Sequence, residues 1–447
     1  MDKTHLATKA SIQHHPKVES LKVKWPDMTL AAKKKAFLKL TRVEAEELFM
    51  ELSTAAQAEI FANLERAEQR SWVRLLAPDD AADLLQEFPA DERPAFLELL
   101  DDDTKKDVMA LLAYDEDAAG GLMNPRFVRL RPDITVDVAI RYLRAQATSS
   151  VETIYYAYVL DAGQKLLGVV TFRNLFVANP EKLVSEIMRT DVITVLEHLQ
   201  QEEVGRKFSE HKLMVLPVID EEGVMKGIVT MDDVVDVVQE EATEDIQKLG
   251  GMEALTAPYF QTTLFEMIKK RAGWLMILFV GEMFTATAMS HYEKEIEKAV
   301  VLALFIPLII SSGGNSGSQA STLMIRAMAL GHVRLKDWLR VFVREISTGL
   351  ALGVILGGIG LLRILLWPSR MTVYGEHFVL VALTVAGSLL GIVLWGTLSG
   401  SMLPFLLRRV GFDPASASAP FVATLVDVTG IIIYFSVASL ILGGTLL

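Results

Sequence analysis

The stretch IPLIISSGGNSGSQASTLMIRA, from Ile306 to Ala327, combines apolar ends with a middle rich in glycine, serine, asparagine and glutamine. Its flanks are apolar enough for a membrane helix. Inside a bilayer, however, every polar group must find a partner within the protein or in water. The stretch therefore predicts a membrane helix that packs tightly against a neighbour, lines a water-filled path, or does both.

The composition of the chain divides it into two parts. The 447 residues are 51% hydrophobic and 22% charged, and the mean hydropathy is +0.32. Residues 259–447 contain 10 acidic and 14 basic side chains, which leaves 46 of the 56 acids and 30 of the 44 bases in residues 1–258. A soluble acidic part thus precedes a slightly basic membrane part. The acidic excess favours cations as partners and argues against nucleic acid, and the absence of cysteine excludes disulfides and thiolate metal sites.

The soluble part begins with a helical segment. Residues 1–30 lack an apolar core of signal-peptide length, and we expect a flexible tail there. In residues 31–120, the stretches APDDAADLLQEF and PADERPAFLELL each place Pro or Asp ahead of a helical apolar stripe. Such repeated short amphipathic helices predict a small helical superhelix, with a generic helical domain as the alternative.

An internal repeat occupies residues 121–240. LLGVVTFRNLF and MKGIVTMDDVV align at an offset of 59, with Gly168 on Gly227 and Thr171 on Thr230. Each copy reads as strand, turn, strand and a helix that begins after a threonine. Two copies of one unit bury their faces on each other, so we expect a paired α/β module.

These residues resemble a tandem pair of CBS domains. In that family, a Gly-h-x-Thr-x-x-Asp pattern places the threonine and the aspartate on the ribose of an adenosine nucleotide. Thr230 and Asp233 fit the pattern, whereas the first copy has Thr171 and Asn174, and an amide accepts fewer hydrogen bonds than a carboxylate. The resemblance implies ATP as a ligand at Thr230 and Asp233. The alternative is a CBS pair that binds no nucleotide.

The membrane part follows a connecting segment. Residues 241–271 are acidic and amphipathic, they end in Lys269, Lys270 and Arg271, and we expect them to form a connecting helix. Residues 272–447 then contain five apolar stretches, each long enough to cross about 30 Å of hydrocarbon. They lie near 272–291, 299–325, 342–366, 378–407 and 418–445.

The charges of the loops predict the orientation. Residues 269–271, the 326–344 loop and Arg408–Arg409 are basic, whereas the two other loops are not strongly so. Basic loops stay in the cytoplasm. We therefore expect an inner or plasma membrane protein of a prokaryote, with the N-terminus and the soluble domains in the cytoplasm and the C-terminus outside.

Asp427 is the one charged residue from Phe421 to Leu447. A carboxylate at that depth costs several kcal/mol unless it faces water or a cation, so we interpret it as a cation ligand or proton carrier. A protonated Asp427 bonded to another helix is the alternative. One turn earlier, Ala423 lies near Pro420, and proline removes a helix hydrogen bond and can free nearby carbonyls.

The opening stretch supplies partners for such an ion. Gly313 and Gly317 form a small-xxx-small pattern suited to close helix packing. The oxygens of Asn315, Gln319 and Thr322 suit a hydrated hard cation, and helix packing alone is the alternative. We predict five residues that line the path: Gly314, Asn315, Gly317, Gln319 and Thr322.

A second acid, Glu282, lies in the first apolar stretch within FVGEMFTATAM. A charged residue at membrane depth requires water, a cation or an opposite charge. The sequence leaves two readings of Glu282 equally open. It either lines the mouth of the path or forms a salt bridge to another span.

PLIISSGGNSGSQAST together with DPASASAPFVATLVDVTGIIIYF resembles the MgtE family of magnesium channels, which is related to the SLC41 transporters. With the helical N domain, the CBS pair and five spans, the resemblance covers nearly the whole chain after residue 30. It implies a multidomain homodimer in the lipid bilayer whose pore lies between protomers. It implies that largely hydrated Mg2+ passes at Asp427 near the carbonyl of Ala423, and Mn2+ and Co2+ are further candidate ions. One departure is Ala419, where some members have asparagine.

The resemblance also implies gating by Mg2+ bound among the helical domain, the CBS pair and the connecting ("plug") helix. The acids expected to take part are Asp79, Asp83, Asp220, Glu222, Asp232 and Glu253, and Asp413 is predicted as a further metal ligand. Thr256 and Gln261 stand where other members carry acids, which leaves the ligand set open. For any single acid, a solvated surface position is the alternative.

The sequence argues against an enzyme. GNSG matches the G-x-S-G of rhomboid proteases, but that chemistry needs a membrane histidine, and none of the eight histidines lies within a span. Aspartyl intramembrane proteases need two aspartates at mid-span, and only Asp427 is present. A CBS-gated secondary transporter, coupled to protons or sodium and carrying divalent cations or another solute, is the main alternative to a Mg2+ channel.

Overall fold

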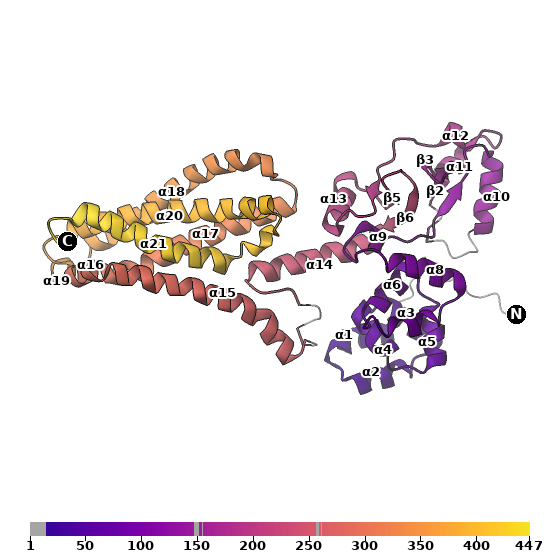
Figure 1. The fold of residues 1–447 in the computed structure, drawn as a ribbon, viewed down its shortest axis with the longest axis horizontal. Helices are drawn as coiled ribbons and strands as arrows, with labels where there is room; N and C mark the ends of the chain where they lie inside the picture. The colour runs from indigo at the N-terminus through magenta and orange to yellow at the C-terminus, as the bar shows by residue number, and fades with distance from the viewer. Residues whose placement is uncertain (1–14, 147–151, 154, 256–258, 261) are drawn as a thin grey trace. The chain divides into compact units, whose positions relative to one another are not determined.

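The structure is a computed structural model that describes residues 15–146, 152–153, 155–255, 259–260 and 262–447 (Figure 1). The chain forms two compact units, Met1–Glu240 and Glu241–Leu447. The expected multidomain architecture is confirmed, since a helical N-terminal part, a CBS pair with small sheets and five apolar helices are all present.

The N-terminal part is a stack of short helices whose starts repeat at a fixed spacing. Helices α2 to α6 begin at residues 30, 42, 54, 66 and 78, a period of twelve residues. Alternate helices pack on one another: α1 on α3, α2 on α4, α4 on α6 and α6 on α8. The elements are α1 Pro16–Lys24, η1 Trp25–Asp27, α2 Leu30–Phe37, α3 Arg42–Glu51, α4 Thr54–Phe61, α5 Arg66–Val73, α6 Pro78–Gln86, α7 Arg93–Leu97, α8 Asp102–Leu111 and α9 Ala119–Leu122.

The twelve-residue period also appears in the hydrogen bonds of this stack. The buried side chain of Gln57 donates to the carbonyl of Phe49 at 2.7 Å, and Gln69 donates to the carbonyl of Phe61 at 2.9 Å. Each glutamine thereby satisfies a carbonyl at the end of the preceding helix, which otherwise has no partner within that helix. Successive helices are therefore joined by the same polar contact as well as by apolar packing.

The prediction that residues 1–30 form a flexible tail is wrong for the part that the structure describes. Residues 16–27 form α1 and η1, and the side chains of Val18 and Trp25 are buried in the helical core. The abundance of lysine in this segment hides its few apolar anchors. Residues 1–14 lie outside the described residues.

The CBS pair contains two three-stranded sheets of the same topology. In each sheet the first and second strands are parallel and the second and third antiparallel, in the orders β1-β2-β3 and β4-β5-β6. The first copy consists of β1 Val128–Leu130, α10 Val136–Gln146, β2 Tyr156–Leu160, β3 Leu166–Thr171 and α11 Phe172–Val177. After α12 Val184–Ile187, the second consists of β4 Val195–Leu196, α13 Gln201–His211, β5 Val215–Ile219, β6 Met225–Thr230 and α14 Met231–Leu249.

The predicted repeat at an offset of 59 holds in the strand register. Tyr156 pairs with Thr171 in one copy and Val215 with Thr230 in the other, and both hairpins shift register at the equivalent place. The aligned glycines have one function in common. A Cβ at Gly168 would lie 2.7 Å from the carbonyl oxygen of Arg189, and one at Gly227 would lie 2.8 Å from that of Asn124. The segment that leads into each copy therefore crosses the sheet of the other copy where only glycine leaves room.

The connecting segment is not one helix. The expected helix over residues 241–271 is interrupted, because α14 ends at Leu249 and α15 begins at Leu264. Gly251 adopts a φ of +72°, a left-handed conformation that favours glycine and ends the helix. A Cβ there would also lie 2.9 Å from the ring of Trp274. The basic residues 269–271 thus lie inside α15, the first apolar helix.

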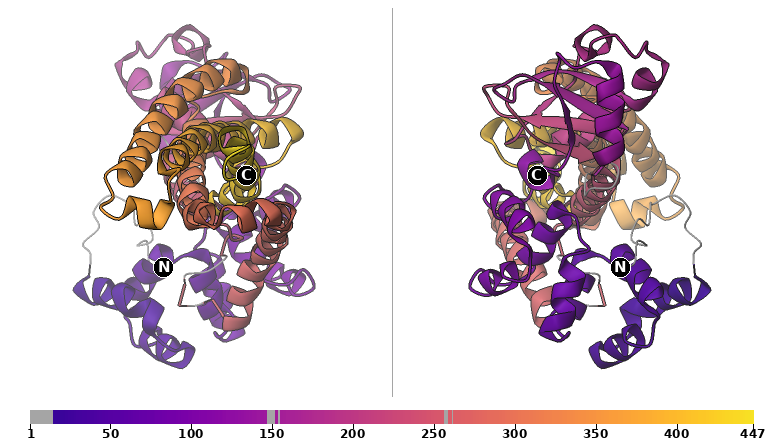
Figure 2. Two further views of the ribbon diagram at one scale, coloured as in Figure 1. Left: turned by 90° about the vertical axis from the view of Figure 1, so that its left-hand side faces the viewer. Right: turned by 90° about the vertical axis from the view of Figure 1, so that its right-hand side faces the viewer.

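Five helices of the second unit are long and apolar enough to cross a membrane (Figures 1 and 2). They are α15 Leu264–His291, α17 Ile306–Ala329 with its preceding turn η2 Val300–Phe305, α18 Trp338–Leu365 with η3 Leu335–Asp337, α20 Phe378–Val410 and α21 Ala419–Leu442. Short helices α16 Glu293–Lys298 and α19 Arg370–Tyr374 and the turn η4 Pro414–Ser416 lie between them.

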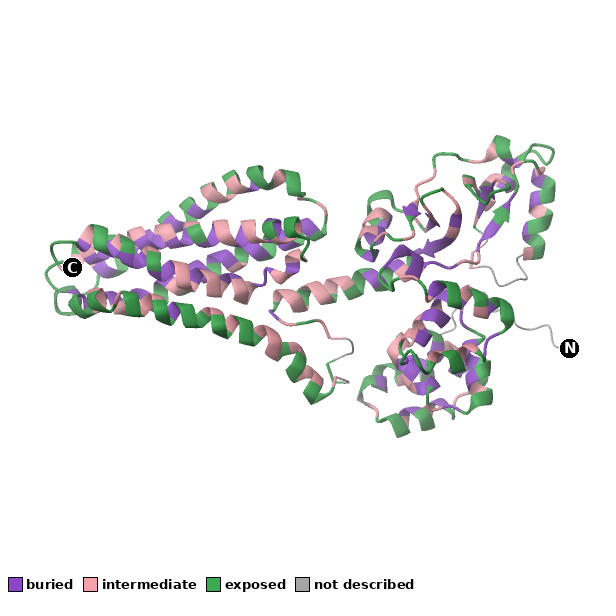
Figure 3. Cartoon of the chain, viewed as in Figure 1, coloured by how far each residue is buried: buried purple, intermediate pink, exposed green. Residues whose placement is uncertain are grey.

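Helices α17, α20 and α21 pack on one another and form the centre of this unit. Helix α18 packs on α20, and α15 packs on α21. Most of α15 is exposed along its whole length, as Figure 3 shows. Helix α21 is thus the main neighbour of α15 within the described part of the centre.

Candidate functional site

The polar stretch of α17 has two different faces. Gly313 and Gly317 are buried, and a Cβ at Gly317 would lie 2.7 Å from Val422 of α21 and 3.0 Å from the carbonyl oxygen of Gly396 in α20. Ser316 is also buried, and its hydroxyl lies 2.6 Å from that of Thr397. This face packs against α20 and α21, so the glycines allow the three helices to approach closely.

The exposed side of α17 carries three larger polar residues. Asn315, Gln319 and Thr322 follow one another at helical spacing, and all three are exposed. The amide of Asn315 donates to the hydroxyl of Ser311 at 3.3 Å, so the stripe extends one turn further. A polar stripe exposed at membrane depth requires water or protein on that side.

Asp427 lies where the two faces meet. Its side chain is half-buried, and a Cβ at Gly314 would lie 3.9 Å from its Oδ1 atom and 3.4 Å from the Cβ of Ala423. Among the described residues, Asp427 makes no hydrogen bond or ion pair. Ala423 lies within α21, so its carbonyl already belongs to the hydrogen bonds of the helix and can offer an ion only its second lone pair.

Glu282, in α15, also has no hydrogen bond or ion pair within the part of the chain that the structure describes. The salt bridge that the sequence left open therefore has no partner in the described chain.

A second group of acids lies in the first unit. Asp79 in α6 is buried and accepts a hydrogen bond at 3.1 Å from Asn124, whose amide also donates to Glu152 at 2.9 Å. Asp83, one turn further along α6, is repelled electrostatically by Asp80, Glu116, Asp233 and Glu240. The helical stack and the CBS pair thus contribute carboxylates to one cluster, which we name the Asp79–Asp83 cluster.

Burial and mutual repulsion change the proton affinity of these carboxylates. Burial, followed by repulsion from neighbouring acids, raises the pKa of Asp83 to about 8. The same causes raise the pKa of Asp233 to about 7, against hydrogen bonds from Thr230, and hold that of Asp79 well above its usual range. Near neutral pH the cluster therefore gains from a proton or a metal cation.

Thr230 and Asp233 contact each other at the start of α14. The hydroxyl of Thr230 lies 2.7 Å from a carboxylate oxygen of Asp233 and 2.5 Å from one of Asp232. The pair required for a ribose is therefore assembled, but its hydrogen bonds are directed inward. A ligand must replace at least one of them.

The other predicted acids lie apart from this cluster. Asp220 pairs with Lys226 at 3.0 Å and accepts from the amide of Val224, and Glu222 is exposed in the same β5–β6 turn. Glu253 lies 3.7 Å from Lys270 in the second unit. Thr256 and Gln261 lie outside the described residues.

Asp413 belongs to a third group of charges, at the end of α14. The ammonium group of Lys248 lies 2.6 Å from Asp413 and also pairs with Glu244. Burial, followed by repulsion from Asp413 and Glu241, raises the pKa of neighbouring Asp245 to about 6. The ammonium group of Lys248 thus supplies the positive charge between these acids, where the sequence predicts a metal ion.

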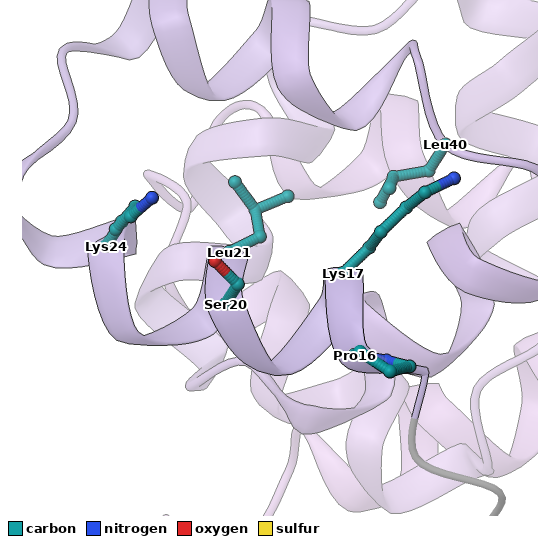
Figure 4. A pocket seen from close by; sticks show the side chains of 6 residues that line it. All are labelled: Pro16, Lys17, Ser20, Leu21, Lys24 and Leu40. Carbon is teal, nitrogen blue, oxygen red and sulfur yellow. The ribbon is translucent and has the colours of Figure 1, made fainter.

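The geometry does not by itself form a metal centre. Within the residues that the structure describes, no group of three acids or histidines is arranged to hold a metal ion. A pocket of about 410 Å³ beside α1 is lined by Lys17 and Lys24 without an acid, and it is unsuited to a cation (Figure 4). Acids separated in this way suit an ion that keeps its water shell, as Mg2+ commonly does.

The sequence did not identify Asp80, Glu116, Asn124, Glu152 and Glu240 as members of the Asp79–Asp83 cluster. Asp79, Asp80 and Asp83 share one side of α6, and that spacing was a readable signal. Nothing local indicates which CBS residues face them, because the contacts join segments far apart in the chain, such as Asp79 and Asn124 at a separation of 45 residues.

Five apolar spans, an acid within the last span and an attached CBS pair define a membrane protein of the ion-transport class. Residues 306–437 match the MgtE divalent cation transporter family, residues 25–117 match the MgtE intracellular N domain, and residues 119–181 and 184–240 match the CBS domain.

The chain is 44% identical over 368 residues to the magnesium transporter MgtE of Thermus thermophilus, an alignment that covers 81% of this chain and 79% of that relative. It is 33% identical to the magnesium transporter MgtE of Enterococcus faecalis over 75% of this chain and 71% of the relative. The chain therefore belongs to the MgtE family, and the predicted family is confirmed.

Two further similarities concern parts of the chain. The cytosolic domain of the Mg2+ channel MgtE in complex with ATP is 40% identical, covers 49% of this chain and 90% of its own, and superposes with a TM-score of 0.46. Inosine-5'-monophosphate dehydrogenase of Aquifex aeolicus is 32% identical over 29% of this chain and 26% of its own length. That match is confined to the CBS domains, so it does not suggest an enzyme.

Proposed function

We propose that this protein carries Mg2+ across a membrane and that the ion passes Asp427. The relatives that cover most of the chain are magnesium transporters. The observation that carries the proposal is Asp427 itself, a carboxylate within the last apolar helix that has no hydrogen-bond or ion-pair partner among the described residues. A cation in transit supplies the missing charge.

The path is formed by two copies of the chain. The stripe of Asn315, Gln319 and Thr322 on α17 is exposed, and among the described residues its one printed side-chain bond runs within α17, from Asn315 to Ser311. A second copy that presents the same face encloses a polar, water-filled passage with one Asp427 from each protomer. Gly314 is buried beside Ala423 and lets α17 approach α21 at the level of Asp427.

Such a passage suits a hydrated ion. Mg2+ gives up water reluctantly, and amide and hydroxyl oxygens bind the water molecules rather than the metal. The functional class is then a channel or transporter for Mg2+, and Mn2+ and Co2+ are further candidate ions. The basic residues 269–271 and 408–409 at the ends of the spans support an orientation with the soluble domains in the cytoplasm and the C-terminus outside.

Mg2+ in the cytoplasm closes the path through the Asp79–Asp83 cluster. Without a divalent cation, Asp79, Asp83 and Asp233 repel one another in a buried setting. Hydrated Mg2+ neutralises them and stabilises the packing of the helical stack on the CBS pair. This packing fixes the start of α14, whose last residues belong to the second unit, so the transported ion favours the closed state.

ATP binds at Thr230 and Asp233 in this proposal. The support is their position at the start of α14, where the side chains already lie within hydrogen-bond distance. ATP should raise the unfolding temperature of the full-length protein, and Asp233→Ala should abolish that rise. If millimolar ATP does not raise the unfolding temperature, the CBS pair is a mechanical coupler that binds no nucleotide.

The experiment that tests the transport proposal is Mg2+ uptake into liposomes that contain the purified protein. Uptake down a Mg2+ gradient, unchanged when proton and sodium gradients are removed, is expected for a channel. Uptake that requires either gradient would instead identify the coupled transporter, for which a single buried acid also suffices. No Mg2+ uptake under any gradient would refute the proposal.

A further inference from the structure

Glu282 is a charged residue in an unusual place. Its side chain is exposed on α15, and it lies ten residues before Tyr292, where the helix ends. Within the part of the chain that the structure describes, it makes no hydrogen bond and no ion pair. A carboxylate at membrane depth that faced lipid alone would be costly, so Glu282 requires water or a cation.

Helix α15 is held beside α21 at two levels. At the first level, the ring nitrogen of Trp274 donates to the hydroxyl of Ser418 at 3.2 Å, and the Trp274 ring lies 6.1 Å from that of Phe421. Near its end, Tyr292 stacks on Phe435 with ring centroids 4.8 Å apart. The two helices therefore run in the same direction with a fixed register.

This register places Glu282 and Asp427 at one depth. Glu282 lies eight residues after Trp274 and ten before Tyr292, and Asp427 lies six after Phe421 and eight before Phe435. Each acid is thus slightly less than halfway between the two ring contacts. Between the acids and the first ring contact, a Cβ at Gly281 would lie 2.7 Å from Thr424, so the helices touch at this level. The two carboxylates repel each other electrostatically.

A separate observation also indicates a missing polar ligand here. Thr285, one turn after Glu282, is buried, and its hydroxyl has no hydrogen-bond partner among the described residues. A buried hydroxyl without a partner loses the hydrogen bonds that it makes in water. Water bound to an ion at this level would supply that partner.

We propose that Glu282 is a second carboxylate of the ion path, which holds a hydrated divalent cation together with Asp427 at one depth of the membrane half. The proposal rests on the proposed function, and it adds a residue that sets affinity and charge selectivity. In a passage shared by two protomers, Glu282 raises the number of carboxylates at this level from two to four, and the added negative charge attracts a divalent ion more strongly than a monovalent one. Both carboxylates accept hydrogen bonds from the water shell, and neither displaces it.

The test measures initial Mg2+ uptake into liposomes by the full-length protein as a function of Mg2+ concentration, with and without excess Na+. Glu282→Gln should raise the half-saturating Mg2+ concentration at least about fivefold and increase inhibition by Na+. Glu282→Asp, which keeps the charge, should lie between Glu282→Gln and the unmodified protein. Glu345→Gln is the matched control, because it removes an acid from α18, which packs on α20 and not on α21.

A double variant separates a shared ion from independent effects. If both carboxylates hold one ion, Glu282→Gln should add little to the loss caused by Asp427→Asn. Size-exclusion profiles and unfolding temperatures of all variants should match the unmodified protein, and if Glu282→Gln fails this check, Glu282→Asp carries the test.

Unchanged half-saturation and unchanged Na+ inhibition in Glu282→Gln would overturn this inference, and such a result would identify Glu282 as a neutral, lipid-facing acid. In that outcome a loss of uptake in Asp427→Asn would still support the proposed function. Absence of Mg2+ uptake by the unmodified protein would overturn both.

Discussion

Gly400 of α20 lies directly against the carbonyl oxygen of Gly317 in α17, so close that a Cβ at residue 400 would overlap that oxygen. One turn earlier in each helix, Gly396 lies against the carbonyl of Gly313 in the same manner. Backbone thus contacts backbone along this seam. The seam fixes the rotation of α17, and with it the side to which Asn315 and Gln319 point.

Gly400→Ala should therefore destabilise the membrane half by about 1–3 kcal/mol, because rigid backbone must move to admit the methyl group. The measurement is the unfolding temperature of the full-length protein in detergent. Gly358→Ala in α18 is the matched control, since no described atom lies within 4 Å of a Cβ built there. Alanine is the better helix former, so this control should be neutral or more stable by up to about 1 kcal/mol. Equal effects of the two substitutions would contradict the packing argument.

Asp427→Asn should leave folding intact and reduce Mg2+ uptake at least about tenfold, because it removes the charge that faces the ion in a shielded environment. Liposome uptake at a fixed Mg2+ gradient measures the effect, with Glu345→Gln as the control. Asn315→Ala, Gln319→Ala and Thr322→Ala should each have smaller effects, since these side chains contact the water shell. Normal uptake by a folded Asp427→Asn protein would exclude this residue from the path.

The Asp79–Asp83 cluster predicts a pH dependence in the absence of divalent cations. The pKa of Asp83 is raised to about 8 and that of Asp233 to about 7, so the folded state binds more protons than the unfolded state above pH 4. Stability of the first unit should therefore fall as the pH rises from about 5 to about 8. Limited proteolysis of the full-length protein across this range should show increasing cleavage within residues 15–240.

Mg2+ should oppose this effect by competing with protons for the same carboxylates. The Mg2+ concentration that protects against proteolysis should fall as the pH rises from 6 to 8. Asp83→Asn should weaken both the pH dependence and the Mg2+ protection, whereas Asp133→Asn, which removes an exposed acid paired with Arg131, should change neither. Cleavage that is indifferent to Mg2+ at every pH would rule out the cluster as the sensor.

Lys248 predicts a different response in the second unit. Its ammonium group lies between Glu244 and Asp413, so Lys248→Met removes the counter-ion that these two acids share. The unfolding temperature without Mg2+ should drop by the equivalent of about 1 kcal/mol, since the side chains are partly exposed to solvent. Added Mg2+ should restore more stability to this variant than to the unmodified protein. Lys336→Met, at an exposed position of η3, should show neither change.

The CBS pair and the spans were predictable from the sequence because their signals are local. The repeat at an offset of 59 reflects hairpins whose two strands are neighbours in the chain, and the spans reflect runs of apolar residues. The helical stack was predicted only in outline. Its period of twelve residues is visible at Phe37, Phe49 and Phe61, but short helices with different surface residues obscure it.

Two features could not be predicted from the sequence: the end of the connecting helix and the partners of the clustered acids. An amphipathic pattern continued through Gly250 and Gly251, and only the left-handed conformation at Gly251 ends the helix. The sequence singled out Asp413 as a metal ligand without indicating that Lys248 lies beside it. Such pairs join residues far apart in the chain, and tertiary packing alone decides which charges meet.

The repeated glutamine contacts of the helical stack have a consequence for how this domain changes in evolution. Since Gln57 and Gln69 join successive helices by identical bonds, one further twelve-residue unit could be inserted between them without new interactions. A gain or loss of one unit would lengthen or shorten the stack by a whole step and turn Asp79 to a new direction. The number of twelve-residue units therefore sets the length of this domain. It also sets the angle at which the domain presents its acids to the CBS pair.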